Sequence, residues 1–320
     1  MKNALQILRF LLDRVACGER TALVTITGAA SSSPRAPGSH MAVSETGTHL
    51  GSLSGGCVEA AVIGEAKRVI AAGRAEQLRL GEGSPFIDIR LSCGGGIDLL
   101  ISPSPDTKGL HQACSWLAAR QRVALLLGQD GSLAAKLAQP DEHPGWDQGI
   151  FLAPHNPDLR LLIVGHGDET LALAKLGLAY GAEITVLSPN QNLVEAALGF
   201  GAEAWKLQKR VRSLHLRADQ HSAVVLLFHD HDWEVELLLQ ALEQPAFFIG
   251  AMGSRTTQAR RLRALAQRGV PTSALARLTG PIGLIGAARD PDTLALSAIA
   301  QIVSVYSESA ALPQSALALT

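Results

Sequence analysis

The chain has 320 residues, of which 47% are hydrophobic and 18% are charged, so it can fold as about two domains and is neither disordered nor fibrous. The formal net charge of −1 at pH 7 gives no indication of a nucleic-acid partner. No apolar run of the sequence is long enough to span a membrane.

Residues 1–140 are predicted to form an N-terminal α/β domain with a mixed sheet. Leu5, Leu8 and Leu12 recur at helical spacing, and Arg9 and Asp13 interrupt the apolar run, so the first element is predicted to be an amphipathic helix rather than a signal peptide. Without a targeting signal, a cytoplasmic location with reduced thiols is expected. Strands are predicted at residues 21–27, 40–43, 49–53, 77–80, 86–91, 97–101 and 123–127, and helices at residues 57–72 and 107–120.

Two of the four cysteines lie in glycine-rich loops of this domain. Cys57 stands at a predicted helix start, where backbone dipoles stabilise a thiolate, and Cys93 precedes three glycines. The glycines would let a bulky ligand approach closely, and the alternative is that both are small buried cysteines beside β-turns. Cys17 and Cys114 lie on helical patterns and are expected in the core. The candidate ligand contacts are Gly55, Gly56, Cys57, Cys93, Gly94 and Gly95.

Proline and glycine residues mark residues 141–158 as the predicted interdomain linker. A Rossmann-like domain is expected at residues 159–308, followed by a tail at residues 309–320. Asp290 is predicted to cap the last helix, which begins at Pro291 and is interpreted as core or dimer interface. A doubly wound parallel sheet is predicted, because helices at 169–180 and 192–200 alternate with strands at 159–165, 183–188, 223–228, 246–250 and 283–286.

The first strand of this domain runs into a GHG turn at residues 165–167 that opens a helix. Such a turn holds a phosphate at the helix N-terminus or is simply tight. The dinucleotide fingerprint is incomplete, because Thr170 replaces the third glycine, and Ser188 and Asn190 stand where a ribose-binding acid is expected. A phosphate-bearing ligand is therefore favoured over intact NAD(P), with Gly165 and Gly167 as the candidate contacts.

A second glycine loop, GAMGSR, follows a later strand and precedes a helix. Small residues, a hydroxyl and an arginine at a helix start favour anion binding, and the alternative is an ordinary capped helix. The candidate contacts are Gly250, Gly253, Ser254 and Arg255. The arginines at positions 255, 260, 261 and 263 are interpreted as one solvated helix face.

The segment FHDHDWE places His229, Asp230, His231 and Asp232 just after a predicted strand. Residues adjacent in sequence rarely converge on one ion, so a permanent metal is disfavoured here. His229 is the candidate ligand contact, as a hydrogen-bond donor or a base. Either aspartate can instead cap the helix that follows.

Together these motifs resemble the xanthine dehydrogenase accessory factor family (XdhC/CoxI), over nearly the whole chain and in the family's order. The pair GGCVE and CGGG is specific, GAMGSR after a strand is nearly as specific, and the GxG turn alone is weak. The matching segments are SSSPRAPGSHMAV, GSLSGGCVEAAV, SCGGGIDLLI, LLIVGHGDETLALAKLGLAYGAEITVL, FHDHDWE, FFIGAMGSRTTQARRLRAL and PIGLIGAARDPDTLALSAIAQI.

The resemblance implies a molybdenum cofactor-binding chaperone rather than an enzyme. Such a protein binds molybdopterin or its dinucleotide form, protects it, helps it to acquire sulfur from a cysteine desulfurase, and delivers it to a xanthine dehydrogenase- or aldehyde oxidoreductase-type apoenzyme. The resemblance also implies a homodimer. Carried over by position, Cys57 and Cys93 are the candidates for contact with molybdenum or its sulfur, and Arg35 is a further cofactor contact.

The chain departs from the family pattern at three places. Ser188-Pro189-Asn190 replaces a common Asp-Pro-Arg, Ile285 replaces an acidic residue, and Gln301 replaces a frequent Glu. Two other functions stay open. One is an NAD(P)-dependent oxidoreductase that uses the GHG turn, and the other is a sulfur-transfer enzyme that carries a persulfide on Cys57.

Overall fold

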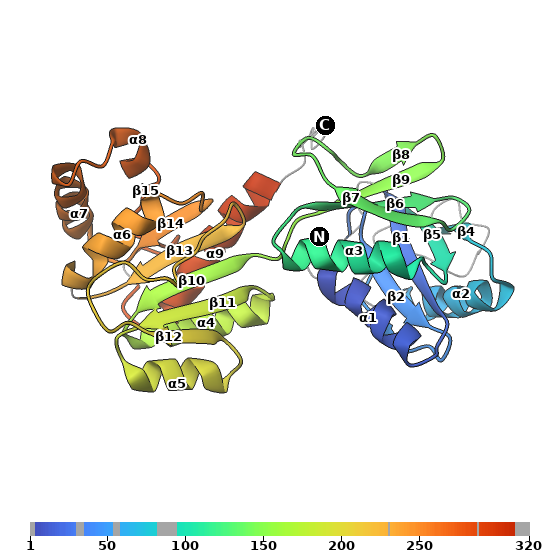
Figure 1. Cartoon of the computed structure of the whole chain (residues 1–320), viewed down its shortest axis with the longest axis horizontal. Coiled ribbons are helices and arrows are strands. Elements are labelled where there is room, and N and C mark those ends of the chain that lie inside the picture. Colours follow the sequence, from blue (N-terminus) through green and yellow to red (C-terminus); the bar gives the residue numbers. More distant parts are fainter. Residues whose placement is uncertain are drawn as a thin grey trace. The chain divides into compact units, whose positions relative to one another are not determined.

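The computed structural model describes residues 4–29, 35–53, 58–81, 95–229, 231–286 and 288–310. The chain divides into two compact units, Met1–Pro157 and Asp158–Thr320, each with its own sheets and core (Figure 1). Within the described ranges, no helix is both long and apolar enough to cross a membrane. The predicted tail starts at residue 309, but helix α9 (Pro291–Ala310) continues to residue 310, and residues 311–320 lie outside the described part.

The N-terminal unit contains two sheets, and every strand pair described in them is antiparallel. The prediction of an α/β domain is confirmed, but the sheets are antiparallel rather than mixed. The larger sheet has the order β3 (His49–Leu50), β2 (His40–Ser44), β1 (Thr21–Ala29), β5 (Gly96–Pro103) and β4 (Glu76–Gly81). The smaller sheet has the order β7 (Leu133–Leu137), β6 (Val123–Gly128), β9 (Ile150–His155) and β8 (Gly145–Asp147).

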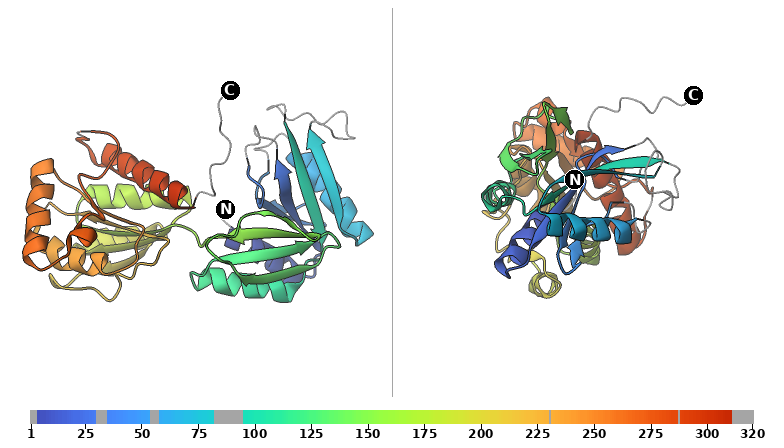
Figure 2. Two further views of the ribbon diagram at one scale, coloured as in Figure 1. Left: turned by 90° about the horizontal axis from the view of Figure 1, so that it is seen from above. Right: turned by 90° about the vertical axis from the view of Figure 1, so that its right-hand side faces the viewer.

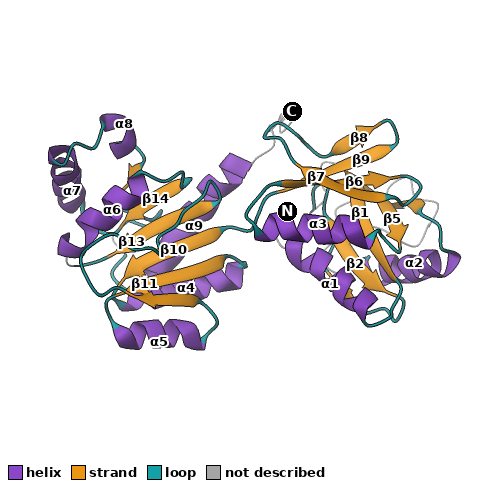
Figure 3. Cartoon of the chain, in the orientation of Figure 1, coloured by secondary structure: helices purple, strands orange, loops and turns teal. Residues whose placement is uncertain are grey.

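The helices described in this unit, which cover these sheets, are α1 (Ala4–Ala16), α2 (Glu59–Ala72) and α3 (Thr107–Ala118) (Figures 2 and 3). Alternate residues of β1 point to opposite faces, so that Val24 packs with α2 while Leu23 packs with α1 and α3. Cys114 is buried in the α1–α3 core, as predicted. The prediction for Cys17 was wrong, because it follows the last residue of α1, outside the apolar stripe, and is exposed.

The segment predicted as a linker, residues 141–158, instead contains β8 and β9. Phe151 and Ala153 alternate with more exposed neighbours and are fully buried in the core that α1 and α3 cover. The abundant prolines and glycines of the segment concealed this period-2 pattern.

The C-terminal unit is a six-stranded, doubly wound parallel sheet, as predicted, and its order reverses between β10 and β13. The described order is β12 (Glu203–Lys206), β11 (Glu183–Ser188), β10 (Arg160–Gly165), β13 (Ser222–Leu227), β14 (Phe248–Ala251) and β15 (Leu278–Thr279). The strand predicted at residues 283–286 is wrong, because this segment is a loop and β15 lies beside β14. The remaining elements are α4 (Asp168–Tyr180), α5 (Gln191–Gly199), a 3-10 turn (His231–Trp233), α6 (Glu234–Leu242), α7 (Arg255–Gln267), α8 (Thr272–Leu275) and α9.

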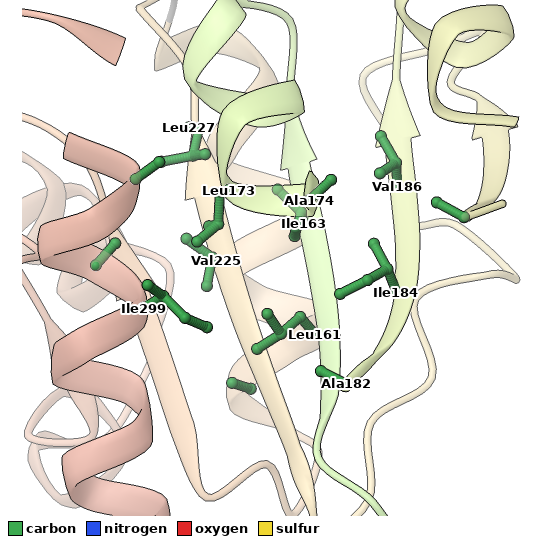
Figure 4. Packing of buried hydrophobic residues seen from close by; sticks show 14 of the residues in the cluster. Leu161, Ile163, Leu173, Ala174, Ala182, Ile184, Val186, Val225, Leu227 and Ile299 are labelled. Atoms are coloured by element: carbon green, nitrogen blue, oxygen red, sulfur yellow. The ribbon is translucent and has the colours of Figure 1, made fainter. Parts of the chain in front are cut away.

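One face of this sheet packs against α4, α5 and α9, and the other packs against α6 and α7. Figure 4 shows Leu161, Ile163 and Val225 of the strands facing Leu173 of α4 and Ile299 of α9. A close approach of α4 requires glycine at position 177, because a Cβ there would lie 2.6 Å from Cδ1 of Ile184. This packing fixes the start of α4 at the carboxyl edge of the sheet, where ligands bind in open α/β folds.

Candidate functional site

A cavity of about 890 Å³ lies in the C-terminal unit, beyond the carboxyl ends of its central strands. Its size is within the range of about 300–1,000 Å³ that is usual for sites of small molecules and cofactors. Its walls come from the start of α4, from the segments after β13, β14 and β15, and from the start of α9. The lining residues are Glu169, Phe228, His229, Met252, Gly253, Ser254, Arg255, Thr257, Pro281, Ile282, Gly283, Ile285, Gly286, Ala288, Arg289, Asp290, Pro291 and Leu294.

The GHG turn contributes to this cavity through a residue that follows it, Glu169. The side chain of Glu169 is folded back over Gly167, where an added Cβ would lie 2.3 Å from Oε1. At Gly165, an added Cβ would lie 2.4 Å from Oγ1 of Thr170 and 2.9 Å from Cβ of Leu227. Both glycines therefore make room for the protein's own side chains. A carboxylate already lies at the helix start where the turn was expected to hold a phosphate, and this disfavours the expected phosphate contact.

Several polar atoms around this turn have no hydrogen-bond partner among the described residues. They are Nδ1 of His166, Oε1 of Glu169 and Oγ1 of Thr170, and all three are buried. Glu169 as a whole is 6% exposed. Nε2 of the exposed His229 lies 3.3 Å from Oε1. Buried polar atoms are usually paired, and of these three residues only Glu169 lines the cavity, so its Oε1 has hydrogen-bonding capacity left for a ligand there.

The second glycine loop lies at the start of α7, and the structure separates its four predicted contacts. Gly250 is inside β14 and packs against the ring of Phe248, away from the cavity. Gly253 (φ +145°), Ser254 and Arg255 line the cavity. Ser254 caps α7, because its Oγ accepts a hydrogen bond from the N–H of Thr257 at 3.1 Å. The capped-helix interpretation is therefore confirmed for Ser254, and Arg255 stays available as an exposed cation at the helix start.

A buried ion pair between Arg261 and Glu234 holds the loop after β14 in place. Arg261 donates to Glu234 through Nε at 3.0 Å and through Nη2 at 2.9 Å, and both side chains are almost completely buried. The same guanidinium donates to the carbonyl of Met252 at 2.8 Å and to Gln258 at 2.7 Å. The interpretation of the arginine run as a solvated face was therefore wrong at Arg261, which anchors the loop after β14.

The segment between β15 and α9 forms the opposite wall, and α9 holds it in place. The N–H of Gly283 donates to Oε1 of Gln301 at 2.6 Å, and the N–H of Ile285 donates to Oγ of Ser297 at 2.7 Å. Two of the departures from the family pattern, Ile285 and Gln301, thus lie in the wall and in its support. Nearby, Arg289 adds a second exposed cation to the cavity.

Asp290 caps α9 as predicted, and Pro291 is its first residue. The N–H of Thr293 donates to Oδ1 of Asp290 at 2.8 Å. This hydrogen bond from the backbone lowers the pKa of the Asp290 carboxyl below its ordinary value. Asp290 is consequently engaged with the helix start, although it borders the cavity.

Two further predicted site residues are described and are not among the residues that line this cavity. Arg35 and Gly95 are described but belong to the N-terminal unit. Five predicted contacts and one aspartate lie outside the described residues: Gly55, Gly56, Cys57, Cys93, Gly94 and Asp230. Among the residues that are described, no group of three His, Cys, Asp or Glu side chains is placed to hold a metal ion. The expectation that Cys57 and Cys93 contact molybdenum therefore stays a prediction.

Sequence reasoning missed Glu169, Arg289 and the wall at residues 281–286. Glu169 had a visible signal, since an acidic residue in the first turn of a helix competes for the place of a bound anion. For Asn190 the structure gives a clear role: its side chain caps α5 by accepting from the N–H of Asn192 at 3.0 Å. The position that would hold a ribose in a dinucleotide site is therefore engaged in helix capping.

The N-terminal unit buries a pair of histidines outside any described cavity. Nε2 of His40 lies 2.9 Å from Nε2 of His155, and Nδ1 of His40 lies 2.8 Å from Oγ1 of Thr25. Burial lowers the pKa of His40 from 6.5 to about 3, and burial followed by the charge of His40 lowers the pKa of His155 well below its ordinary value. Both imidazoles are neutral, and they join β2 of one sheet to β9 of the other.

Comparison with known proteins finds relatives that match both units of the chain. The family model of the XdhC Rossmann domain matches residues 161–302, and that of the XdhC and CoxI family matches residues 15–81. Over 300 residues the chain is 33% identical to the molybdenum cofactor insertion chaperone PaoD of Escherichia coli (strain K12), covering 93% of this chain and 87% of that protein. It is also 28% identical over 172 residues to the uncharacterized protein YqeB of the same organism, covering 50% of this chain and 30% of that protein.

A solved structure resembles the whole chain. It is the crystal structure of a protein from Bacillus halodurans that carries the name xanthine dehydrogenase, with a TM-score of 0.77 and 22% sequence identity. The match covers 99% of this chain and 98% of that one. At this identity the likeness shows the fold alone.

Proposed function

The chain belongs to the XdhC and CoxI family, and on that premise we propose that it is a molybdenum cofactor chaperone. It binds the cofactor as cargo, protects it and passes it to a xanthine dehydrogenase- or aldehyde oxidoreductase-type apoenzyme. The relative that is 33% identical over 93% of the chain is named as an insertion chaperone, an accessory protein rather than an enzyme. When bound in its target enzyme, the cofactor supplies the redox-active molybdenum centre.

The observation that carries this proposal is the cavity of the C-terminal unit. Its volume is within the usual range for cofactor sites, and it lies where the strand order reverses, which is the usual ligand position of doubly wound folds. Its walls combine the buried, unpaired Oε1 of Glu169 with the exposed cations Arg255 and Arg289. In the described part of the chain, neither guanidinium is paired with a carboxylate. These groups fit a ligand that has a polar ring at one end and a phosphate at the other.

The finer steps of the function are carried over from the resemblance. Cys57 and Cys93 would approach the molybdenum–sulfur end of the cargo, since thiolates are suitable ligands for soft metals. Gly55, Gly56, Gly94 and Gly95 would leave the space for this approach, and Arg35 would contact the cofactor from the same unit. We further propose that a cysteine desulfurase supplies the sulfido ligand, that the protein acts as a homodimer in the cytoplasm, and that the cargo is molybdopterin or its cytosine dinucleotide.

An NAD(P)-dependent oxidoreductase gains no support from the site. The carboxylate of Glu169 lies at the start of α4, where a pyrophosphate would bind, and its negative charge would repel a pyrophosphate there. Asn190 caps α5 instead of presenting a carboxylate to a ribose. Titration with NADH or NADPH is expected to leave the fluorescence of the tryptophans unchanged.

The test is anaerobic purification from cells that make the cofactor, followed by oxidation of the released ligand to its fluorescent pterin and by molybdenum analysis. About one pterin per chain is expected in the wild type. The exposed Cys17 provides the matched control, so Cys17→Ala should keep the pterin whereas Cys57→Ala should lose most of it. A wild-type protein that carries no pterin, even after incubation with excess cofactor, would refute the proposal. Full retention in Cys57→Ala would refute only the role of that thiol.

A further inference from the structure

Glu169 has an environment that its role in folding does not explain. It lies in the first turn of α4, is 6% exposed, and its Oε1 accepts no hydrogen bond from any described residue. Burying a carboxylate oxygen without a donor costs free energy, so an unpaired one is seldom retained for stability alone. The side chain nevertheless borders the cavity.

The same unit shows how this chain satisfies a carboxylate that is structural. Glu234 is equally buried, and both of its oxygens accept hydrogen bonds from Arg261, at 2.9 and 3.0 Å. For Glu169 the contact among the described residues is with Nε2 of His229, at 3.3 Å, and the side chain of that histidine is 69% exposed. The contrast indicates that the missing donors for Glu169 come from a molecule in the cavity.

The donors that suit a carboxylate best are two parallel N–H groups on one planar edge. An arginine side chain has such an edge, but a cationic ligand would be repelled by Arg255 and Arg289, which line the same cavity. A neutral heterocycle with an amino group beside a ring N–H has the same edge without the charge. The 2-amino-4-oxopyrimidine ring of a pterin is such a heterocycle. Met252, Ile285 and Leu294 offer apolar surface to its faces.

We infer that Glu169 recognises the 2-amino-4-oxopyrimidine edge of the cargo, so that the pterin is held at the start of α4 in the C-terminal unit. This inference rests on the proposed function and deepens it, because it gives the cavity a defined chemical specificity. It also explains the folded-back position of Glu169, since a carboxylate at this helix start excludes a phosphate there and leaves the anionic end of the ligand to Arg255 and Arg289.

Two commercially available nucleotides test the inference on the purified, cofactor-free full chain. GMP has the same edge, with a ring N–H beside a 2-amino group, and IMP differs from it only by lacking that amino group. By titration calorimetry, GMP is expected to bind about tenfold or more tightly than IMP, as for the loss of one hydrogen bond to a charged acceptor. In Glu169→Gln the two affinities should agree within about twofold, because the amide offers its own N–H groups to the ligand.

The exposed Glu195 of α5 provides the matched control, and Glu195→Gln should keep the wild-type preference for GMP. Equal affinities for GMP and IMP, no detectable binding of GMP, or an unchanged preference in Glu169→Gln would each overturn the inference. If any of these results is obtained, and the same protein carries a molybdenum cofactor when it is purified from cells that make one, the chaperone proposal stands and the assignment of Glu169 fails. A preserved preference for GMP in a protein that never carries a pterin would support the recognised edge and refute the chaperone proposal.

Discussion

The buried histidine pair makes the N-terminal unit sensitive to mild acid. In the unfolded chain His40 and His155 take up protons near pH 6.5, whereas in the folded chain burial holds the pKa of His40 at about 3 and that of His155 well below its ordinary value. The unfolded state therefore binds more protons than the folded state below pH 6.5, so stability falls as the pH falls. The loss is absent above about pH 7.5 and grows until the pH reaches the folded pKa values.

The size of the effect follows from the two pKa values. For one histidine with an unfolded pKa of 6.5 and a folded pKa far lower, lowering the pH from 7.5 to 5.5 removes about 1.4 kcal/mol of unfolding free energy. The pair is therefore expected to remove about 2.7 kcal/mol over these two pH units. Most carboxylates stay ionised in this range, which keeps their contribution small.

Urea unfolding at a series of pH values, with hydrogen exchange of peptides from β1, β2 and β9 to assign the transition, measures this quantity in the full chain. In His155→Gln the pH-dependent loss should fall to about half, because one of the two titrating groups is gone. The exposed His143 is the matched control, and His143→Gln should keep the full dependence. A wild-type loss below about 1 kcal/mol over this range would show that the pair is not buried and neutral in the way described.

Three further perturbations test the C-terminal unit. Arg261→Met should lower the unfolding free energy of this unit by about 3–5 kcal/mol, because Glu234 would stay buried without a donor. In urea unfolding, the double variant Glu234→Leu with Arg261→Met should recover most of that free energy. Equal losses in the single and the double variant would contradict the role of the ion pair. Gly167→Ala should abolish the preference for GMP over IMP at little cost in unfolding free energy, because the new methyl group displaces the carboxylate at the end of the flexible Glu169 side chain. An intact preference would show that the carboxylate does not need this position. Asp290→Ala should lower the unfolding free energy by about 1 kcal/mol, because α9 loses its cap, and hydrogen exchange should increase only in the first turn of α9. Unchanged hydrogen exchange in that turn would argue against the cap.

The fold was predictable in segments where the pattern of apolar residues clearly indicated a strand or a helix. The parallel strands β10, β11 and β13 are continuous apolar runs, and α4 ends at Gly181 in the left-handed conformation that glycine favours. The segment at residues 141–158 was misjudged because its prolines and glycines outweighed the alternation of Phe151 and Ala153. Residues 283–286 looked like a short strand, but hydrogen bonds from Gln301 and Ser297 hold them as a loop. Such long-range partners leave no local pattern in the sequence.

The position of the two glycine turns was predictable from the sequence, but the chemistry of the cavity beside them was not. The glycine turns correctly indicated the carboxyl edge of the sheet, because only a tight turn lets a helix start there. The expectation of a phosphate at Gly165 and Gly167 depended on the helix start being open, and the side chain of Glu169 fills it. Likewise, Arg261 looked like part of a solvated face, because its partner Glu234 lies 27 residues away in the sequence. Which charged side chains are paired depends on tertiary contacts that a single sequence does not display.

Transfer of the cargo tests the central claim most directly. The protein is purified anaerobically with its cofactor and mixed with a cofactor-free enzyme of the xanthine dehydrogenase or aldehyde oxidoreductase type, and pterin content and enzyme activity are followed on the separated partners. The chaperone account predicts that about one pterin per chain leaves this protein, appears in the enzyme and restores its activity. If this protein never holds a pterin, or holds one that no such enzyme can accept, the account is contradicted.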